Sequence, residues 1–334
     1  MTSVYAIDEE SAVGEARRGA AHMAARLGFS DVQSGQLALI VTEAGRNLVR
    51  HAGGGQLLLR AHEDSSAIHI LTLDRGPGIP DVARALRDGF STGGTSGNGL
   101  GAIKRLASQF DIYSQAGNGT AMFVCCAPGD DGDCSARPGT PTDLQVGVVQ
   151  VAMPGEEVCG DSWGIKRRAG RDSFMICDGL GHGPQAALAS REGERIFHER
   201  DGSPGDLLED AHAALRHTRG AAMALATRES SGAATFAGAG NIAATLCDPP
   251  NRRGLMSHNG IVGGQMRRAG EIAFDWPTEA TLVMHSDGLG TSWSLDKYPG
   301  LAARHPALIA GVLFRDFARE RDDATVMVAR PMPA

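Results

Sequence analysis

The sequence predicts an α+β protein of two domains. The chain has 334 residues, and at roughly 150 residues per domain this length is enough for two cores. Residues 127–143 contain three prolines, three glycines and four aspartates without apolar periodicity, a composition typical of linkers. Helix and strand patterns alternate before this segment, and hairpin-spaced strands with grouped helices follow it. We therefore expect a first domain over residues 1–126, a linker over 127–143 and a second domain over 144–334.

Composition excludes several classes of protein. With 45 glycines and 15 prolines the chain is glycine-rich but within the globular range. A net charge of −7 without a long basic run argues against a nucleic-acid partner. No apolar stretch reaches the roughly 18 residues of a membrane span, and the N-terminus, MTSVYAIDEE, lacks the basic and apolar regions of a secretory signal. We expect a cytoplasmic protein that binds neither membrane nor nucleic acid.

Six cysteines are present, and none forms the CxxC pair of a structural zinc site. Several lie within apolar runs, such as FVCCA and SFMICD, so we expect reduced, buried thiols. The six are Cys125, Cys126, Cys134, Cys159, Cys177 and Cys247.

The first half predicts an α/β arrangement. In the second of its expected helices, apolar residues recur near the 3.6-residue helical period at Leu37, Ile40, Val41, Ala44 and Leu48, and the glycines at 53–55 end it. We expect helices at 8–27, 30–52 and 100–109, and strands at 56–62, 67–74, 110–115 and 120–126.

The second half is richer in strands, which carry apolar or β-branched runs. Grouping of helices between blocks of such strands indicates packed antiparallel sheets. We expect strands at 144–153, 173–177, 233–237, 242–248, 281–286 and 324–329, and helices at 184–200, 204–228 and 305–320.

Three segments of the first half together suggest a nucleotide site. Glu43 and Asn47 are four residues apart on one helix face, where a carboxylate and an amide can hold a Mg²⁺ that bridges phosphates. Asp74, at a strand end, can accept a hydrogen bond from the exocyclic amine of a base. Each signal is weak alone, and the order and spacing of the three carry the interpretation.

Glycines surround these polar residues. Those at positions 76 and 78 allow a base to approach the backbone closely. Another group precedes a helix whose free N–H groups suit phosphate. The glycines concerned are Gly76, Gly78, Gly97, Gly99 and Gly101.

These residues resemble the GHKL ATPase family. The segments EAGRNLVRHAGGG, DRGPGIP and GFSTGGTSGNGLGAIKRLASQFDIYS are similar to its N, G1 and G2 boxes, and the short lid is closest to bacterial anti-sigma-factor serine kinases of the stressosome switch type. Over residues 10–126 the resemblance implies a Bergerat-type α/β sandwich that binds ATP with Mg²⁺. It makes Glu43 the general base toward a substrate hydroxyl, Asn47 the Mg²⁺ ligand and Asp74 the adenine contact, with the glycines lining the nucleotide and Thr120 on the adenine side. The sensor histidine kinases are disfavoured, since no phospho-accepting histidine box precedes these motifs.

The second half carries aspartates at strand ends. Asp161 stands in CGDSW, Asp178 in CDGLGHG, Asp287 in HSDGLG, and Asp322 and Asp323 in RDDATV. A single Asp-Gly after a strand is usually a turn. Several aspartates at strand ends, two of them in DGLG motifs, instead indicate that they contribute to one functional site. Hard divalent cations prefer carboxylate, carbonyl and water oxygens, and two such ions activate water for attack on phosphorus.

This pattern resembles the metal-dependent PPM-type serine/threonine phosphatases of the SpoIIE-like branch. Over residues 144–331 the resemblance, supported by AGAGNIAATL and RDDATVMVAR, implies an αββα sandwich holding two Mn²⁺ or Mg²⁺ ions. It makes Asp178 the bridging ligand, with the Gly179 carbonyl on one ion, Asp287 and Asp322 on the other, and Asp161 acting through bound water. Asp323 competes with Asp322 for this role.

Two histidines stand near these motifs. Many animal and plant members of the phosphatase family have a histidine two residues after the bridging aspartate, where this chain has Leu180. His182 is therefore a candidate general acid, with a helix-entry role favoured over it. His285 lies on an apolar strand and is expected to be a hydrogen-bonded core residue.

Together the resemblances imply a phosphatase that acts on a phosphorylated STAS-domain protein in a partner-switching pathway, with a sigma factor or a switch kinase as a further partner. Three alternatives stand for the first domain: an active protein-serine kinase, an ATP-binding sensor or docking module, and a protein-binding module without ATP chemistry. A degenerate, binding-only phosphatase fold is the rival for the second, although none of its aspartates is lost.

Overall fold

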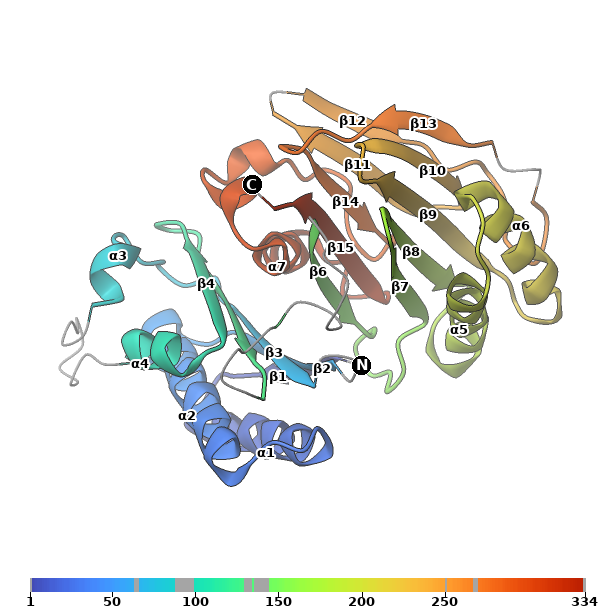
Figure 1. Ribbon diagram of the computed structural model, residues 1–334. Coiled ribbons are helices and arrows are strands. Elements are labelled where there is room, and N and C mark those ends of the chain that lie inside the picture. Colours follow the sequence, from blue (N-terminus) through green and yellow to red (C-terminus); the bar gives the residue numbers. More distant parts are fainter. Residues whose placement is uncertain are drawn as a thin grey trace. The chain divides into compact units, whose positions relative to one another are not determined.

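The computed structural model describes residues 2–62, 66–87, 99–128, 134, 144–249, 251–266 and 270–332. Contacts divide the chain into two compact units (Figure 1). The first comprises Met1–Pro138 with Ser294–Arg315, and the second Gly139–Trp293 with Asp316–Ala334. The segment 294–315, expected within the second domain, therefore groups with the first unit.

The first unit is a five-stranded antiparallel sheet with helices on one face (Figure 1). Strand order is β1-β2-β3-β5-β4. The strands are β1 (Thr2–Ala6), β2 (Gln56–His62), β3 (Ala67–Leu73), β4 (Gln109–Ser114) and β5 (Thr120–Cys126). The helices are α1 (Glu10–Arg26), α2 (Asp31–Asn47), the π-helix η1 (Leu48–Ala52), α3 (Val82–Ala85) and α4 (Gly99–Leu106).

Local sequence explains the central helix of this unit. Ser30 and Gln33 form a reciprocal capping box at the start of α2, which satisfies N–H groups that have no partner within the helix. The apolar stripe of α2 is buried, as its spacing predicts. The helix continues as one π-helical turn and ends at Gly53, whose φ of 74° favours glycine.

The opposite face of this sheet is also covered. Leu71, Leu73 and Phe123 are buried there. An alanine Cβ at Gly311 would lie 2.8 Å from a methyl of Leu71, and the ring of His305 stacks on Phe123 with centroids 4.2 Å apart. The covering segment contains η4 (Leu295–Lys297), η5 (Leu301–Ala303) and most of α7 (Pro306–Phe317). The apolar runs of β3 and β5 follow from this, because strands buried on both faces lose polar alternation.

The second unit contains two five-stranded antiparallel sheets that enclose one core. One sheet has the order β13-β10-β9-β8-β7, and the other β12-β11-β14-β15-β6. The first consists of β7 (Asp161–Arg168), β8 (Arg171–Gly179), β9 (Ala221–Glu229), β10 (Ala233–Ala239) and β13 (Ile272–Asp275). The second consists of β6 (Leu144–Val151), β11 (Ala243–Asp248), β12 (Asn251–Leu255), β14 (Thr281–His285) and β15 (Ala324–Pro331).

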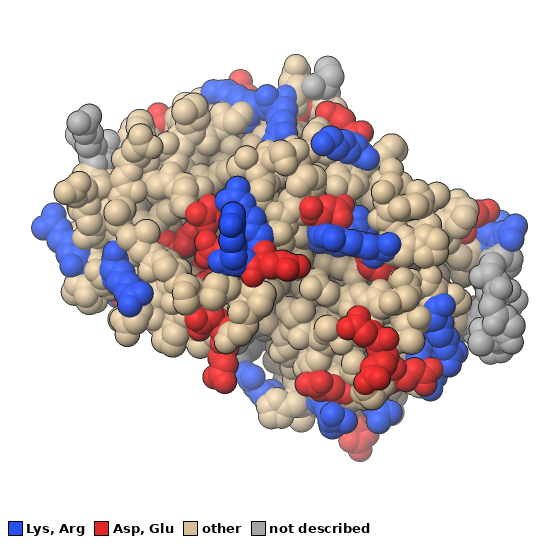
Figure 2. Space-filling view, turned by 180° about the vertical axis from the view of Figure 1, so that it is seen from behind, with Lys and Arg blue, Asp and Glu red and all other residues tan. Residues whose placement is uncertain are grey.

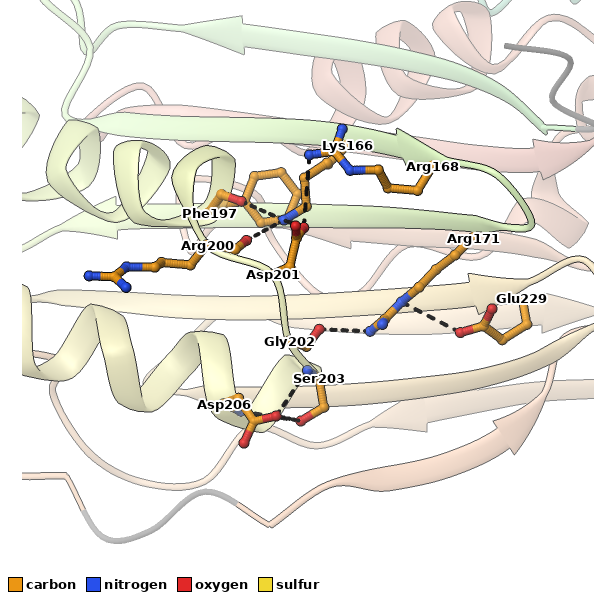
Figure 3. A network of polar contacts seen from close by, with 10 residues as sticks. All are labelled: Lys166, Arg168, Arg171, Phe197, Arg200, Asp201, Gly202, Ser203, Asp206 and Glu229. Atoms are coloured by element: carbon orange, nitrogen blue, oxygen red, sulfur yellow. Dashed lines mark hydrogen bonds and ion pairs between the residues drawn. The ribbon is translucent and has the colours of Figure 1, made fainter.

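Helices α5 (Gly183–Glu199) and α6 (Pro204–Ala214), the latter followed by η3 (Leu215–His217), pack on the first of these sheets. Figure 3 shows the hydrogen bonds and the ion pair that connect the end of α5 to Lys166 of β7. The buried Lys166 ammonium donates to the carbonyls of Phe197, at 2.9 Å, and Arg200, and lies 3.0 Å from the carboxylate of Asp201. A positive group at the helix C-terminus satisfies its last carbonyls and complements the helix dipole.

Two expectations are wrong. The helix expected over 204–228 ends at Ala214, and Ala221–Glu229 forms the strand β9 at the centre of its sheet. Gly220, with a φ of 85°, directly precedes this strand, and burial between sheet neighbours overrides the helix propensity of the alanines.

The second error concerns the thiols. Cys125 and Cys134 form a disulfide, whereas the other four cysteines are buried thiols outside disulfides. Sequence could not show this pairing, because disulfide formation depends on the spatial approach of two Cα atoms, here 6.2 Å apart.

The surface carries mixed charge. On the face shown in Figure 2, basic and acidic side chains are interspersed among uncharged residues. In the described ranges, no helix has the length and apolar character needed to cross a membrane.

Candidate functional sites

A cavity of about 890 Å³ in the first unit collects the residues expected to bind a nucleotide. Helices α2 and α4 and strands β3 and β5 contribute to its wall. Glu43, Asn47, Asp74, Gly99 and Thr120 all line it, although they come from four separate segments of the chain. The fold thus brings the three sequence motifs to one cavity.

Glu43 and Asn47 stand at one side of this cavity. A Cβ on Gly99 would lie 3.3 Å from Glu43 Oε2 and 3.6 Å from Asn47 Oδ1, so the start of α4 faces both side chains. The Asn47 Nδ2 atom is buried and makes no hydrogen bond to the described residues. Arg46 Nη1 lies 3.3 Å from Glu43 Oε1. An amide and a carboxylate beside a helix start suit phosphates and Mg²⁺.

Asp74 directly follows β3 and lines the same cavity. Its Oδ1 accepts hydrogen bonds from the N–H groups of Gly76, at 2.9 Å, and Thr120, at 3.0 Å. Burial raises the pKa of this carboxyl group, and these two amides oppose the rise. Both bonds use the same oxygen, which orients the carboxylate within the cavity wall.

The glycines near Asp74 are required by close packing. At Gly119 the φ is 77°, and a Cβ would lie 2.0 Å from the Asp74 carbonyl oxygen. At Gly78 the φ is 73° and a Cβ would lie 2.3 Å from a backbone oxygen of Gln115, while at Gly76 it would meet Ala52 at 2.6 Å. Gly101 is buried in α4, and Gly97 lies outside the described residues.

The aspartates of the second unit gather at one end of its two sheets. Asp161, at the start of β7, is the register partner of Asp178 on β8. Asp287 follows β14, and Asp322 and Asp323 directly precede β15. Since β14 and β15 are paired neighbours, four segments distant in sequence bring carboxylates together.

Hydrogen bonds between the sheets fix this arrangement. The Ser286 hydroxyl donates to Asp161 Oδ2 at 2.7 Å and accepts from the Thr325 N–H at 2.9 Å. Asn241 Nδ2 donates to Asp287 Oδ2 at 2.6 Å. Sequence reasoning did not identify Ser286, Thr325 or Asn241 as members of this site, although AGAGN and HSDG contain two of them.

The two competing aspartates differ in their hydrogen bonds. Asp323 uses both oxygens on backbone groups, accepting from the N–H of Met153 and of Gly160 at 2.9 Å each. Asp322 accepts a bond from the N–H of the adjacent Asp323, and its carboxyl group neighbours that of Asp287. Asp323 is therefore engaged in holding loops, which favours Asp322 as the ligand.

The clustered carboxylates oppose one another's ionisation. Burial, followed by repulsion from Asp161, Asp287, Asp322 and Asp323, raises the pKa of Asp178. Burial likewise raises the pKa of Asp161, whose buried Oδ1 accepts no hydrogen bond from the described part of the chain. A bound cation would stabilise the ionised form of these carboxylates.

The donor set fits hard divalent cations, but the ligand sphere is not closed. In the described ranges, no group of three or more His, Cys, Asp or Glu side chains is arranged as a metal site. Gly179 is packed so closely that a Cβ would lie 2.0 Å from the Ala186 carbonyl oxygen, so its backbone path is fixed beside Asp178. The support for a cation here is therefore the set of oxygen donors and the repulsion between the carboxylates, and not a completed coordination geometry.

The two histidines differ. His182 is the N-cap residue of α5, and its Nδ1 lies 2.6 Å from Glu156 Oε1. His285 is buried, with its Nδ1 2.8 Å from the Ser286 carbonyl and its Nε2 accepting from the Trp293 indole at 3.2 Å. The expectation of a hydrogen-bonded core histidine at 285 is confirmed.

Comparison with known proteins defines the class. Residues 7–124 match the histidine kinase-like ATPase domain family, and residues 168–331 match the stage II sporulation protein E (SpoIIE) family. The chain belongs to these two families, as an ATPase-type domain fused to a SpoIIE-type phosphatase domain, and the predicted two-domain α+β fold is confirmed.

Particular relatives follow. The serine/threonine-protein kinase RsbT of Bacillus subtilis (strain 168) is 38% identical over 109 residues, which are 32% of this chain and 82% of RsbT. A structure reported under "The bacterial stressosome: a modular system that has been adapted to control secondary messenger signaling" has a TM-score of 0.53 at 26% identity, and covers 56% of this chain and 99% of its own. The phosphatase domain of SpoIIE from Bacillus subtilis, with a regulatory fragment, has a TM-score of 0.46 at 17% identity over 81% of each chain.

Proposed function

We propose that this protein hydrolyses phosphoserine or phosphothreonine on a partner protein through its SpoIIE-type domain. The observation that carries the proposal is the convergence of Asp161, Asp178, Asp287 and Asp322 at one end of two facing sheets, with the pKa of Asp178 raised by burial and by its carboxylate neighbours. Such a cluster is unfavourable by itself and is stabilised by positive charge.

Asp178, the Gly179 carbonyl, Asp287 and Asp322 would hold two Mn²⁺ or Mg²⁺ ions. The ions, when bound, supply an activated water nucleophile and neutralise charge on the phosphoryl group. Asn241 orients Asp287, Ser286 orients Asp161, and Asp323 holds the loops of Met153 and Gly160. These residues fix the carboxylates in place before substrate arrives.

The first unit, in this proposal, binds ATP with Mg²⁺. Asn47 holds the cation, Asp74 accepts from the adenine amine, Thr120 lies on the adenine side, and Gly76, Gly78, Gly97, Gly99 and Gly101 belong to the nucleotide-binding loops. The lining of the 890 Å³ cavity by Asn47, Asp74 and Thr120 supports this assignment.

The partner class is a phosphorylated STAS-domain protein in a pathway that controls a sigma factor. Similarity to RsbT and to a structure described under the bacterial stressosome supports this class. A sigma factor or a switch kinase is the further partner that such a pathway would supply.

The test of the phosphatase is a dephosphorylation assay with Mn²⁺ and with EDTA. Asp178→Asn should abolish turnover with the fold intact, whereas Asp275→Asn, at the exposed end of β13, should retain it. Turnover that persists in EDTA, or in a well-folded Asp178→Asn variant, would contradict the metal assignment.

A second activity, protein-serine kinase, is favoured by the 38% identity over 109 residues to a serine/threonine-protein kinase. Glu43 lies within residues 7–124, which match the histidine kinase-like ATPase domain family. Glu43 would serve as general base toward the acceptor hydroxyl. Incubation with γ-labelled ATP and the STAS partner should show transfer that is lost in Glu43→Ala. Nucleotide binding without transfer in the wild type would instead leave the domain as a sensor or docking module.

A further inference from the structure

Helix α7 links the nucleotide cavity to the phosphatase motifs along the chain. Its residues up to Arg315 belong to the first unit, and from Asp316 onward the chain belongs to the second. The helix is one continuous element, Pro306–Phe317. Arg315 and Phe317 both lie in its last turn, so a displacement of one residue moves the other.

In the last turn of α7, Arg315 contacts the residue expected to bind adenine. The buried Arg315 Nη1 donates to the Asp74 carbonyl oxygen at 2.9 Å. In return, the Arg75 guanidinium donates to the Arg315 carbonyl oxygen. Two reciprocal bonds thus join residues 74–75 to a single position of α7.

The same backbone stretch is fixed by the nucleotide loop. Asp74 holds the N–H groups of Gly76 and Thr120 on its Oδ1, and Thr120 lines the cavity. Gly119 leaves no room for a Cβ above the Asp74 carbonyl. Arg315 therefore positions the peptide that carries the adenine-binding carboxylate.

Two residues further on, the chain joins the aspartate cluster. The Phe317 carbonyl accepts from the Gly290 N–H at 2.9 Å, and the Arg319 N–H donates to the Gly288 carbonyl at 2.7 Å. Gly288 directly follows Asp287, and a Cβ on it would lie 1.9 Å from the Asp323 carbonyl oxygen. Residues 317–319, at and after the end of α7, are thus hydrogen-bonded to the DGLG loop, and the chain then reaches Asp322.

We propose that Arg315 is a positioning residue of the nucleotide site, and that through α7 ATP binding changes the affinity of the aspartate cluster for its cations. This inference rests on the proposed function, whose two sites it connects. The coupling is reciprocal: if ATP changes the affinity for the cations by some factor, the cations change the affinity for ATP by the same factor. Couplings carried by packed networks amount to about two- to thirtyfold in affinity.

The experiment uses the full chain, a non-hydrolysable ATP analogue with Mg²⁺, and Mn²⁺ held at buffered free concentrations. Calorimetry measures the affinity for the analogue in wild type, Arg315→Ala and Arg315→Lys. Arg304→Ala is the matched control, because Arg304 is in the same segment but contacts Asp111, outside the cavity. We expect about two- to thirtyfold weaker binding in Arg315→Ala, partial rescue by lysine, and wild-type binding in the control.

Coupling is measured in the same proteins as the Mn²⁺ affinity, and as the kcat for p-nitrophenyl phosphate, with and without saturating analogue. We expect the analogue to shift the wild-type Mn²⁺ affinity, and to leave it unshifted in Arg315→Ala at saturation. Wild-type analogue affinity in a folded Arg315→Ala variant overturns the positioning role. An unshifted Mn²⁺ affinity in the wild type overturns the coupling.

Failure of the proposed function gives a different result. Absence of hydrolysis under every condition removes the phosphatase proposal, while the calorimetric Mn²⁺ comparison still decides the coupling. Hydrolysis that is unaffected by the analogue, together with an unshifted Mn²⁺ affinity, removes the coupling alone.

Discussion

Replacing Asp74 by asparagine tests the adenine contact directly. The two hydrogen bonds that hold this side chain both end on Oδ1, so an asparagine can keep them with its remaining oxygen. Its amide group then takes the place of Oδ2 and presents a donor to the adenine amine, which is itself a donor. The variant should keep its fold and lose the base contact.

The magnitude follows from the bond that is lost. A hydrogen bond to a charged group contributes about 1.5–3 kcal/mol, and each 1.4 kcal/mol is a factor of ten in affinity. Asp74→Asn should therefore bind ATP about ten- to hundredfold more weakly. Asp31→Asn is the control, since it removes a negative charge from the exposed first turn of α2.

The assay compares ATP with purine riboside triphosphate, which lacks the exocyclic amine. Wild-type protein should bind the purine analogue more weakly than ATP, whereas Asp74→Asn should distinguish the two much less. This double cycle isolates the amine contact from general damage. Equal weakening of both nucleotides would refute the reasoning, because it would mean that Asp74 acts only through Gly76 and Thr120.

Two further predictions concern the other features. Gly288→Ala should lower phosphatase turnover at least about tenfold, because the added Cβ would lie 1.9 Å from the Asp323 carbonyl oxygen and overpacking of this kind shifts the backbone. Gly254→Ala is the control, because the space around that position is open and turnover should be unchanged. Equal turnover in the two variants would contradict this packing argument. Burial lowers the pKa of His62 to about 3 and the pKa of His69 as well, so both favour the neutral form in the fold, and stability should be fully present above pH 6.5 and fall as the pH drops toward 3. Urea unfolding of His69→Leu should lose about 1.4 kcal/mol less per pH unit than wild type over that window, and parallel pH curves would disprove this origin of the acid sensitivity.

Sequence patterns located most of the elements and selected the residues of both candidate sites. Strands at 56–62 and 120–126 have the predicted bounds, because apolar runs bounded by turn residues are local signals. Pro204–Ala214 and Ala221–Glu229 show the limit, since both are alanine-rich and only burial in a sheet makes the second a strand. The Cys125–Cys134 disulfide is a second limit, because its pairing depends on distance.

What the sequence alone determined is the identity of the functional groups, since carboxylates, amides and glycines at motif spacing carry their chemistry wherever they stand. Tertiary structure decided which of them act on one another. It engaged both oxygens of Asp323 with backbone groups, brought Asn241 to Asp287, and placed Arg315 on the carbonyl of Asp74, 241 residues away in sequence. Such contacts depend on the packing of distant segments, and packing is a property of the whole fold rather than of any local pattern.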